Sequence, residues 1–193
     1  MMIRVLQTNL GRSRAAHDLT DATAARKNIE LLVVAEPNKN IVRKQNNNWL
    51  SHRNSDVAIK IRNRRMGIKD HTKGNKGWIR IEMTGYDIYC YYISPNIERN
   101  EFKAITDEIM TEVKTRAREA IIMGDINAKS YQCGLATADV RGEYWTMWMA
   151  EINSIVINEG TTATFIRGES KPYIDVTCAT IKITKDIVTT EVF

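Results

Sequence analysis

The stretch IIMGDINAKS, residues 121–130, begins as an apolar strand and ends at an acid. Three apolar residues lead into Gly124, and Asp125 and Asn127 follow directly. Gly, Asp and Asn are common in turns, so a plain turn is one interpretation of this pattern. The other interpretation is a reaction centre at the end of a core strand, and the rest of the chain has to decide between them.

The composition indicates a globular domain with one basic segment. The chain has 193 residues, of which 43% are hydrophobic and 26% are charged, as in a single domain with a substantial core. No apolar run reaches membrane-spanning length, and MMIRVLQTNL lacks the layout of a signal peptide. The net charge is +5, yet residues 60–80 alone hold eight Lys or Arg and one Asp. This basic segment predicts contact with nucleic-acid phosphates; the alternative is a solvated loop between strands.

The cysteines and histidines show no metal-site pattern. There is no C-x-x-C, and the odd number of cysteines without a secretion signal predicts reduced thiols in or near the core at Cys90, Cys133 and Cys178. No zinc-ligand spacing connects the three histidines, His17, His52 and His71.

Hydrophobic periodicity predicts a strand-rich chain into which helices are inserted singly. Helical spacing predicts one helix capped by Ser13, a second over about 98–117 and a third around Trp145 and Trp148, whereas polar residues 38–48 predict a loop. Strands are expected at 3–7, 31–37, 57–61, 79–83, 87–94, 121–125, 154–158, 163–167, 173–179 and 186–193. Two sheets packed face to face with helices outside would bury the apolar faces of these strands and helices. The predicted fold is therefore an α/β (α+β) sandwich of four layers.

Polar residues follow several of these apolar runs. Asn9 ends IRVLQTN, Glu36 ends LLVVAE, Tyr92 lies at the end of DIYCYYIS, and Asp175 lies in PYIDVT. Strands that run the same way bring such residues to one rim, where they would join Asp125. Carboxylates, carboxamides and a tyrosine hydroxyl suit a hard cation such as Mg²⁺ together with a phosphate. Such a site can orient water for in-line attack on phosphorus.

Six short motifs, taken in order, resemble the exonuclease–endonuclease–phosphatase superfamily: LQTN (6–9), AEP (35–37), YYISPN (91–96), GDINAKS (124–130), TFIRG (164–168) and YIDVT (173–177). Within it they are similar to the apurinic-endonuclease-like domain at the front of non-LTR retrotransposon proteins. GDINAKS followed by ADVRGE and TFIRG resembles the insect elements that insert into ribosomal DNA or telomeric repeats. The resemblance implies a DNase-I-like sandwich of two mixed sheets.

The resemblance also implies roles for the first three polar positions. Glu36 matches the family's main Mg²⁺ ligand, with Mn²⁺ as an alternative metal, and Asn9 matches the Asn that helps to order the metal site. Tyr92 matches the Tyr whose hydroxyl contacts the scissile phosphate. YISPN has one more residue before its Pro than the pattern of the repair enzymes.

Three further roles follow from the later motifs. Asp125 matches the Asp that activates or positions the attacking water, and Asn127 matches the Asn that orients that Asp and the phosphate. Asp175 matches the Asp that pairs with a catalytic His in a final Ser-Asp-His motif, but no His follows Asp175 before Phe193. We therefore expect a domain truncated before that motif, which nicks DNA poorly until it is extended.

The implied function is an endonuclease that nicks one strand of double-stranded DNA and leaves a 3′-hydroxyl. A reverse transcriptase domain in the same polyprotein would extend that end, which implies a nuclear location and no membrane partner. Candidate DNA contacts are Arg12, Arg14, Arg62, Arg64, Arg65, Ser130 and Arg141, the last beside Asp139. Two alternatives remain: a phosphatase of the same superfamily that acts on a small phosphomonoester, and a DNA-binding module without catalysis.

Overall fold

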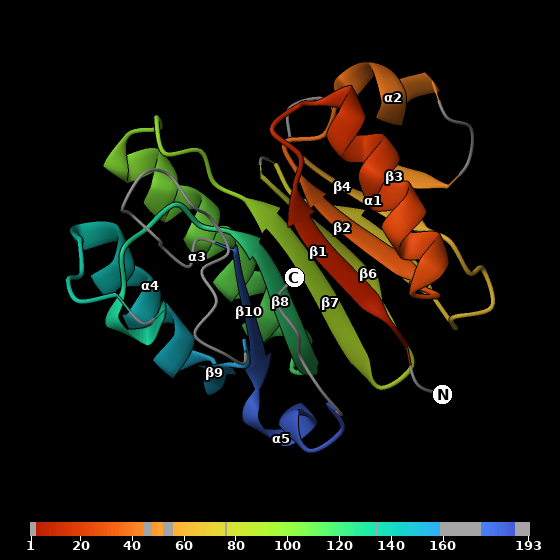
Figure 1. Cartoon of the computed structure of the whole chain (residues 1–193). Coiled ribbons are helices and arrows are strands. Elements are labelled where there is room, and N and C mark those ends of the chain that lie inside the picture. Colours follow the sequence, from red (N-terminus) through yellow and green to blue (C-terminus); the bar gives the residue numbers. More distant parts are fainter. Residues whose placement is uncertain are drawn as a thin grey trace.

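Two β-sheets lie face to face, with helices on their outer faces (Figure 1). The computed structural model describes residues 3–44, 48–51, 56–75, 77–133, 135–158 and 175–187. One sheet has the order β1-β2-β4-β3, formed by β1 (Val5–Asn9), β2 (Leu31–Ala35), β3 (Trp49–Ser51) and β4 (Val57–Ile61). The other has the order β5-β6-β7-β8-β10-β9, formed by β5 (Asp70–Lys73), β6 (Trp78–Glu82), β7 (Tyr86–Tyr92), β8 (Glu119–Asp125), β9 (Ser154–Val156) and β10 (Asp175–Thr180).

Both sheets are mixed. The pairs β1–β2 and β7–β8 are parallel, and the other strand pairs are antiparallel. The arrowheads of β1 and β7 point toward the same end of the molecule (Figure 1). The carboxyl ends of β1, β2, β7 and β8 therefore meet at one edge of the sandwich, as the strand-end residues predicted.

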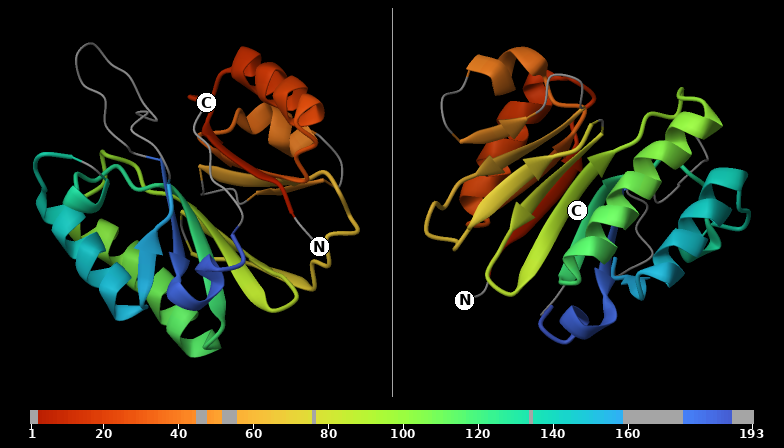
Figure 2. Two further views of the ribbon diagram at one scale, coloured as in Figure 1. Left: turned by 60° about the horizontal axis from the view of Figure 1, so that its bottom comes forward. Right: turned by 180° about the vertical axis from the view of Figure 1, so that it is seen from behind.

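Helices complete the four layers (Figure 2). The outer face of the four-stranded sheet carries α1 (Arg14–Arg26) and α2 (Lys39–Lys44); the outer face of the six-stranded sheet carries α3 (Arg99–Arg116) and α4 (Val140–Glu151). Ser13 caps α1, since its hydroxyl accepts a hydrogen bond from the Ala16 N–H at 3.3 Å. The expected α/β (α+β) sandwich of four layers is confirmed, whereas the loop predicted for 38–48 is wrong where α2 forms.

Alternation along the strands divides the core into layers. In β2, Leu31 and Val33 pack between the two sheets, while Leu32 and Val34 pack beneath α1. A strand with both faces buried needs apolar residues throughout, which explains the unbroken run LLVVA. β7 lies between β6 and β8 and is buried on both faces in the same way, as predicted for a central strand.

A third layer of core lies between the six-stranded sheet and its helices. Phe102 of α3 and Trp145 and Trp148 of α4 are buried there, so the tryptophans pack a helix on a sheet. The three cysteines are free and buried, as predicted. None of the helices that the structure describes is long and apolar enough to span a bilayer.

Several short elements differ from the sequence prediction. β3 and β5 were not predicted, and residues 181–184 form a short helix, α5 (Ile181–Thr184). The strand predicted at 163–167 lies outside the described residues. So does most of the strand predicted at 186–193, whose first two residues are not in a strand.

Candidate active site

The strand ends bring five of the predicted side chains to one edge of the sandwich. We call this group the acidic edge; it consists of Asn9, Glu36, Tyr92, Asp125 and Asp175. The four-stranded sheet supplies the first two, and the six-stranded sheet supplies the other three.

Asp125, at the end of β8, is held rigidly in the acidic edge. It is 1% exposed. Its Oδ2 accepts a hydrogen bond from Asn9 Nδ2 at 3.0 Å, and its Oδ1 accepts one from the Asn127 backbone N–H at 3.0 Å. Asn127 has a φ of 48° and donates its side-chain amide to the Ile93 carbonyl at 3.2 Å. The residues GDIN therefore form a turn, and that turn fixes a buried carboxylate. The motif is thus both a turn and a candidate reaction centre.

The glycine before Asp125 is required by the neighbouring strand. A Cβ at Gly124 would lie 2.0 Å from the Tyr91 carbonyl oxygen of the parallel strand β7. Gln7 of the opposite sheet donates its side-chain amide to the Gly124 carbonyl at 3.1 Å and accepts a hydrogen bond from the Thr177 hydroxyl at 3.0 Å. These contacts tie β1, β8 and β10 together just below the acids.

Asp175 lies directly across from Asp125, because β10 runs antiparallel to β8 in that register. Burial raises the pKa of Asp125 to about 6, although the hydrogen bonds from Asn9 and Asn127 act in the opposite direction. Burial and then the nearby charge of Asp125 raise the pKa of Asp175 to about 7. A carboxyl whose pKa lies near neutral pH is suited to accept a proton during catalysis.

The raised pKa values of Asp125 and Asp175 predict that the protein without metal is more stable in mild acid than at pH 8. A carboxyl with a raised pKa in the folded state contributes stability that is present below about pH 4 and is lost as the pH rises through 6 to 7. Asp175→Asn should therefore stabilise the protein at pH 8 by on the order of 2 kcal/mol and have little effect at pH 4. Urea unfolding at both pH values, with the exposed Asp18→Asn as control, measures this. An equal effect of Asp175→Asn at the two pH values would contradict it.

Glu36 occupies a sharp turn after β2. Its φ is 45°, its N–H donates to the Asp56 carbonyl at 2.7 Å, and its own carbonyl accepts from the Arg12 N–H at 2.8 Å. Its Oε1 lies 3.2 Å from Arg12 Nη2, and the side chain is 23% exposed. Tyr92 lies near Glu36, and burial followed by the charge of Glu36 raises the Tyr92 pKa. Glu36 thus faces both solvent and the rest of the acidic edge.

Asp56 is an acid at this edge that sequence analysis missed. It precedes β4, which runs antiparallel to β2, so the start of β4 lies beside the end of β2. Asp56 Oδ2 lies 3.3 Å from Arg12 Nη2, and Asp56 Oδ1 lies 2.8 Å from Lys39 Nζ. The available signal was an acid next to an apolar alternating run, at the amino end rather than the carboxyl end of a strand.

His17 supports the turn after Glu36 from beneath. It is buried in α1, and its Nε2 accepts a hydrogen bond from the Asn38 N–H at 2.9 Å. Asn38 in turn donates its side-chain amide to the Arg12 carbonyl at 3.0 Å. Burial lowers the pKa of His17, which favours the neutral ring that this contact requires. His17 therefore has a positioning role, and the His partner predicted for Asp175 stays a prediction.

The oxygen donors at the acidic edge fit a hard divalent cation. Two carboxylates, from Glu36 and Asp56, converge on one cationic nitrogen of Arg12. Mg²⁺ prefers one or two carboxylates and retains several waters, so a full cage of protein ligands is not needed. Consistent with that, no group of three or more His, Cys, Asp or Glu side chains arranged to hold a metal occurs among the described residues.

The predicted DNA contacts divide into exposed and structural residues. Arg12 lies at the acidic edge, and Arg14 is exposed two residues later at the start of α1. Ser130 is 1% exposed and shares a hydrogen bond with the Thr146 hydroxyl at 3.0 Å, so it is held inside the protein, and its DNA contact stays a prediction. Arg141 donates to the Ser94 carbonyl at 3.3 Å and to the Ile97 carbonyl.

Arg141 therefore orients the loop after β7 and is not a free phosphate contact. Its guanidinium also lies over the Phe102 ring, 5.2 Å from the centroid. Asp139, its neighbour in the sequence, caps α4 by accepting from the Gly142 N–H at 2.8 Å. Both residues fix the loops that lead out of β7 and into α4.

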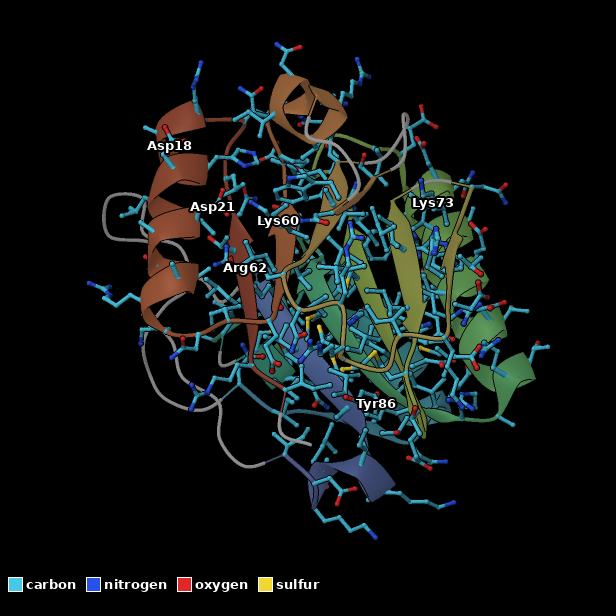
Figure 3. The ribbon with its side chains drawn as sticks, turned by 90° about the vertical axis from the view of Figure 1, so that its right-hand side faces the viewer. Asp18, Asp21, Lys60, Arg62, Lys73 and Tyr86 are labelled. Carbon is cyan, nitrogen blue, oxygen red and sulfur yellow. The ribbon has the colours of Figure 1, made fainter. Side chains whose placement is uncertain are left out.

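The basic segment 60–80 is not one continuous surface. Lys60 binds Asp21 of α1 at 2.8 Å, with Arg62 beside them (Figure 3). Arg80 is 3% exposed and lies within 3.5 Å of three carboxylates, those of Asp70, Glu82 and Glu112. The expectation of a DNA-contacting strip is therefore wrong for Lys60 and Arg80, whose charges are neutralised within the protein.

Arg62, Arg64 and Arg65 lie away from the acidic edge. The Arg62 N–H donates to the Glu30 carbonyl, at the start of β2, whereas Glu36 follows its end. The two positions are six residue steps apart along β2, about 20 Å at roughly 3.4 Å per step. The structure does not bring these arginines together with the acids.

This placement changes the expected result of replacing them. The triple variant Arg62→Ala, Arg64→Ala, Arg65→Ala should leave the slope of log K against log salt for DNA binding unchanged, because its charges lie far from the acidic edge. Arg12→Ala with Arg14→Ala should flatten the slope by roughly 0.9 for each phosphate that the protein no longer neutralises. Fluorescence anisotropy at a series of salt concentrations compares the two variants. A flatter slope in the triple variant would restore these arginines as DNA contacts.

Comparisons with known proteins agree with the fold of two packed sheets. Residues 86–192 match the model of the family described as endonuclease-reverse transcriptase. The endonuclease domain of TRAS1, a telomere-specific non-LTR retrotransposon, is similar in structure with a TM-score of 0.74 and 23% identity, over 94% of this chain and 86% of that one. No curated protein matches the sequence.

Two further nucleases have the same fold. An AP endonuclease from Archaeoglobus fulgidus aligns with a TM-score of 0.69 and 14% identity, over 95% of this chain and 89% of that one. The 3′-5′ exonuclease NExo from Neisseria meningitidis aligns with a TM-score of 0.67 and 14% identity, over 93% and 87%. At these identities the likeness establishes the fold, which confirms the DNase-I-like sandwich implied by the motifs.

Proposed function

Because this chain belongs to the endonuclease-reverse transcriptase family, we propose that it is the Mg²⁺-dependent endonuclease domain of a non-LTR retrotransposon. It nicks one strand of double-stranded DNA and leaves a 3′-hydroxyl for reverse transcription. The observation that carries this proposal is the buried Asp125, held by Asn9 and Asn127 and facing Asp175. Such a carboxylate has little structural value, since its burial costs free energy that an apolar residue would not.

Asp125, Asn9 and Tyr92 of the acidic edge, together with Asn127, have roles in phosphodiester hydrolysis. Asp125 accepts a proton from the attacking water and orients it toward phosphorus, and its pKa of about 6 keeps it mostly ionised at neutral pH. Asn9 and Asn127 hold its two oxygens, so its direction of attack is fixed. Tyr92 keeps its proton, because its pKa is raised, and its hydroxyl can donate to a phosphate oxygen.

Glu36 is the side chain best placed to hold the metal. Its side chain is 23% exposed, and its Oε1 lies 3.2 Å from Arg12 Nη2. A bound Mg²⁺ supplies charge stabilisation for a phosphate oxygen and the leaving group. Mn²⁺ prefers similar ligands and should substitute for it.

The proposed partners are double-stranded target DNA and a reverse transcriptase domain of the same polyprotein. TRAS1 is telomere-specific, and by analogy this chain would act on a chromosomal repeat in the nucleus. Target choice would come from the loops around the acidic edge and from DNA shape, since the acids reach only the backbone.

Nicking of supercoiled plasmid tests the proposal. Plasmids that carry ribosomal or telomeric repeats are incubated with the protein in Mg²⁺, in Mn²⁺ and in EDTA, and the ends are mapped. We expect metal-dependent open circles with 3′-hydroxyl ends clustered in the repeat. Release of phosphate from a 3′-phosphorylated oligonucleotide without nicking would favour a phosphatase, and salt-sensitive binding without either reaction would favour a binding module.

A further inference from the structure

Four charged side chains meet beside the metal position proposed for Glu36. Arg12 Nη2 lies 3.2 Å from Glu36 Oε1 and 3.3 Å from Asp56 Oδ2, so a single nitrogen joins the two carboxylates. Lys39 Nζ lies 2.8 Å from the other oxygen of Asp56. Lys39 thereby binds Oδ1, whereas Oδ2 contacts the same Arg12 nitrogen as Glu36 does.

We propose that Asp56 is a second carboxylate of the divalent-cation site, and that Arg12 is the counter-ion that the metal displaces. When the metal binds, the guanidinium leaves the two carboxylates and binds a phosphate of the DNA. This inference rests on the proposed function, because it assigns two more residues to the same site.

The exchange is physically reasonable because the Arg12 contacts are weak. The Arg12 side chain is 59% exposed, and ion pairs of this exposure contribute roughly 0 to 1 kcal/mol. A divalent cation carries twice the charge and approaches carboxylate oxygens to about 2 Å. Two carboxylates already turned toward one point therefore attract the metal more strongly than they attract the guanidinium.

The backbone allows Arg12 to leave without moving the carboxylates. The Arg12 N–H donates to the Glu36 carbonyl at 2.8 Å, and the Glu36 N–H donates to the Asp56 carbonyl at 2.7 Å. Asn38 adds a hydrogen bond to the Arg12 carbonyl. These main-chain contacts fix all three positions, so only the arginine side chain has to turn.

Direct metal binding tests the role of Asp56. Free Mn²⁺ is measured by electron paramagnetic resonance during titration of the wild type, Asp56→Asn, Arg12→Ala and two controls on α1, Asp18→Asn and Arg14→Ala. We expect Asp56→Asn to weaken binding by roughly 10-fold or more. Arg12→Ala should tighten it by roughly 2- to 5-fold, which corresponds to the removal of a competing exposed pair.

The opposite signs make the test robust, since a misfolded variant cannot bind Mn²⁺ more tightly. Unchanged affinity in Asp56→Asn would overturn the assignment of Asp56, and unchanged or weaker affinity in Arg12→Ala would overturn the assignment of Arg12. Wild-type protein that binds no Mn²⁺ would overturn the proposed metal dependence as well. Metal-dependent nicking together with equal Mn²⁺ affinity of wild type and Asp56→Asn would overturn only the inference.

DNA binding tests the displacement of Arg12. The slope of log K against log salt is measured for wild type and Arg12→Ala, once with Ca²⁺ and once with EDTA. With Ca²⁺, the slope for wild type should be steeper than the slope for Arg12→Ala by roughly 0.9, the value for one phosphate contact. With EDTA the two slopes should agree, because Glu36 and Asp56 hold the guanidinium. A difference of equal size in both conditions would show that Arg12 contacts DNA without being displaced by metal.

Discussion

Asp125→Ala and Glu36→Ala should each reduce plasmid nicking by about 10²-fold or more, with the fold retained. Asp125→Ala removes the carboxylate that orients the attacking water, and Glu36→Ala removes the carboxylate best placed for the metal. The fold should survive because both acids lie at the ends of strands, and the layers beneath them are apolar. Removing the buried charge of Asp125 should even relieve its repulsion from Asp175.

Asp18→Ala is the matched control for these two variants. It removes one carboxylate from the exposed surface of α1 and should nick at the wild-type rate. Circular dichroism and thermal melting of all three variants separate loss of chemistry from loss of structure. Full nicking activity in a folded Asp125→Ala protein would remove the acidic edge from the mechanism.

Gly142→Ala should destabilise the protein by about 3 kcal/mol, the upper end of the range for overpacking. A Cβ at Gly142 would lie 1.6 Å from the Lys129 carbonyl oxygen and 3.1 Å from the Ser130 nitrogen. Both neighbours are backbone atoms, so no side chain can rotate away, and α4 has to separate from the loop that follows Asn127. For a protein of this length we expect Tm to fall by roughly 6 to 12 °C.

The same separation should also slow nicking, because the loop that moves is continuous with the turn that holds Asp125. Gly85→Ala is the control, since Gly85 has a φ of +96° but a Cβ added there would meet no atom within 4 Å. It should cost only about 1 kcal/mol of backbone strain and leave nicking unchanged. If Gly142→Ala melts no lower than Gly85→Ala, the close approach of α4 to the Lys129 carbonyl is not what limits stability.

Much of the fold follows from apolar periodicity alone. The runs LLVVA and DIYCYYIS are buried on both faces, and both became central strands. The short elements were missed because their patterns are weak. β5 has the sequence DHTK without an apolar residue, and it forms because it can hydrogen-bond to the edge of β6.

The acidic edge was predicted from polar residues at the ends of strands. The same rule explains which acid was missed. Asn9, Glu36 and Asp125 end strands that point to one edge, so the rule located them. Asp56 and Asp175 instead begin strands that run the other way, β4 and β10. Sequence order does not reveal strand direction, so Asp56 was not recognised. Asp175 was predicted from its place in PYIDVT and from its resemblance to a motif, although its strand runs the other way.

Charge was the least informative property of the sequence. Residues 60–80 are basic in composition, but Lys60 and Arg80 are neutralised by acids from other elements, Asp21 and Glu112 among them. Such partners are distant in sequence and become visible only in three dimensions. The hydrogen bond between the Ser130 hydroxyl and Thr146 of α4 is likewise a contact that the sequence does not reveal.

The division of the acidic edge between two sheets has a consequence for the order of events during translation. The four strands of the first sheet lie within residues 5–61, so a ribosome delivers Asn9 and Glu36 early. Asp125 comes much later, and Asp175 comes later still, on a strand that must be inserted between β8 and β9. A nascent chain therefore carries no competent set of acids until most of it has been synthesised. Under the proposed function, hydrolytic activity is thereby coupled to the folding of β8 and β10.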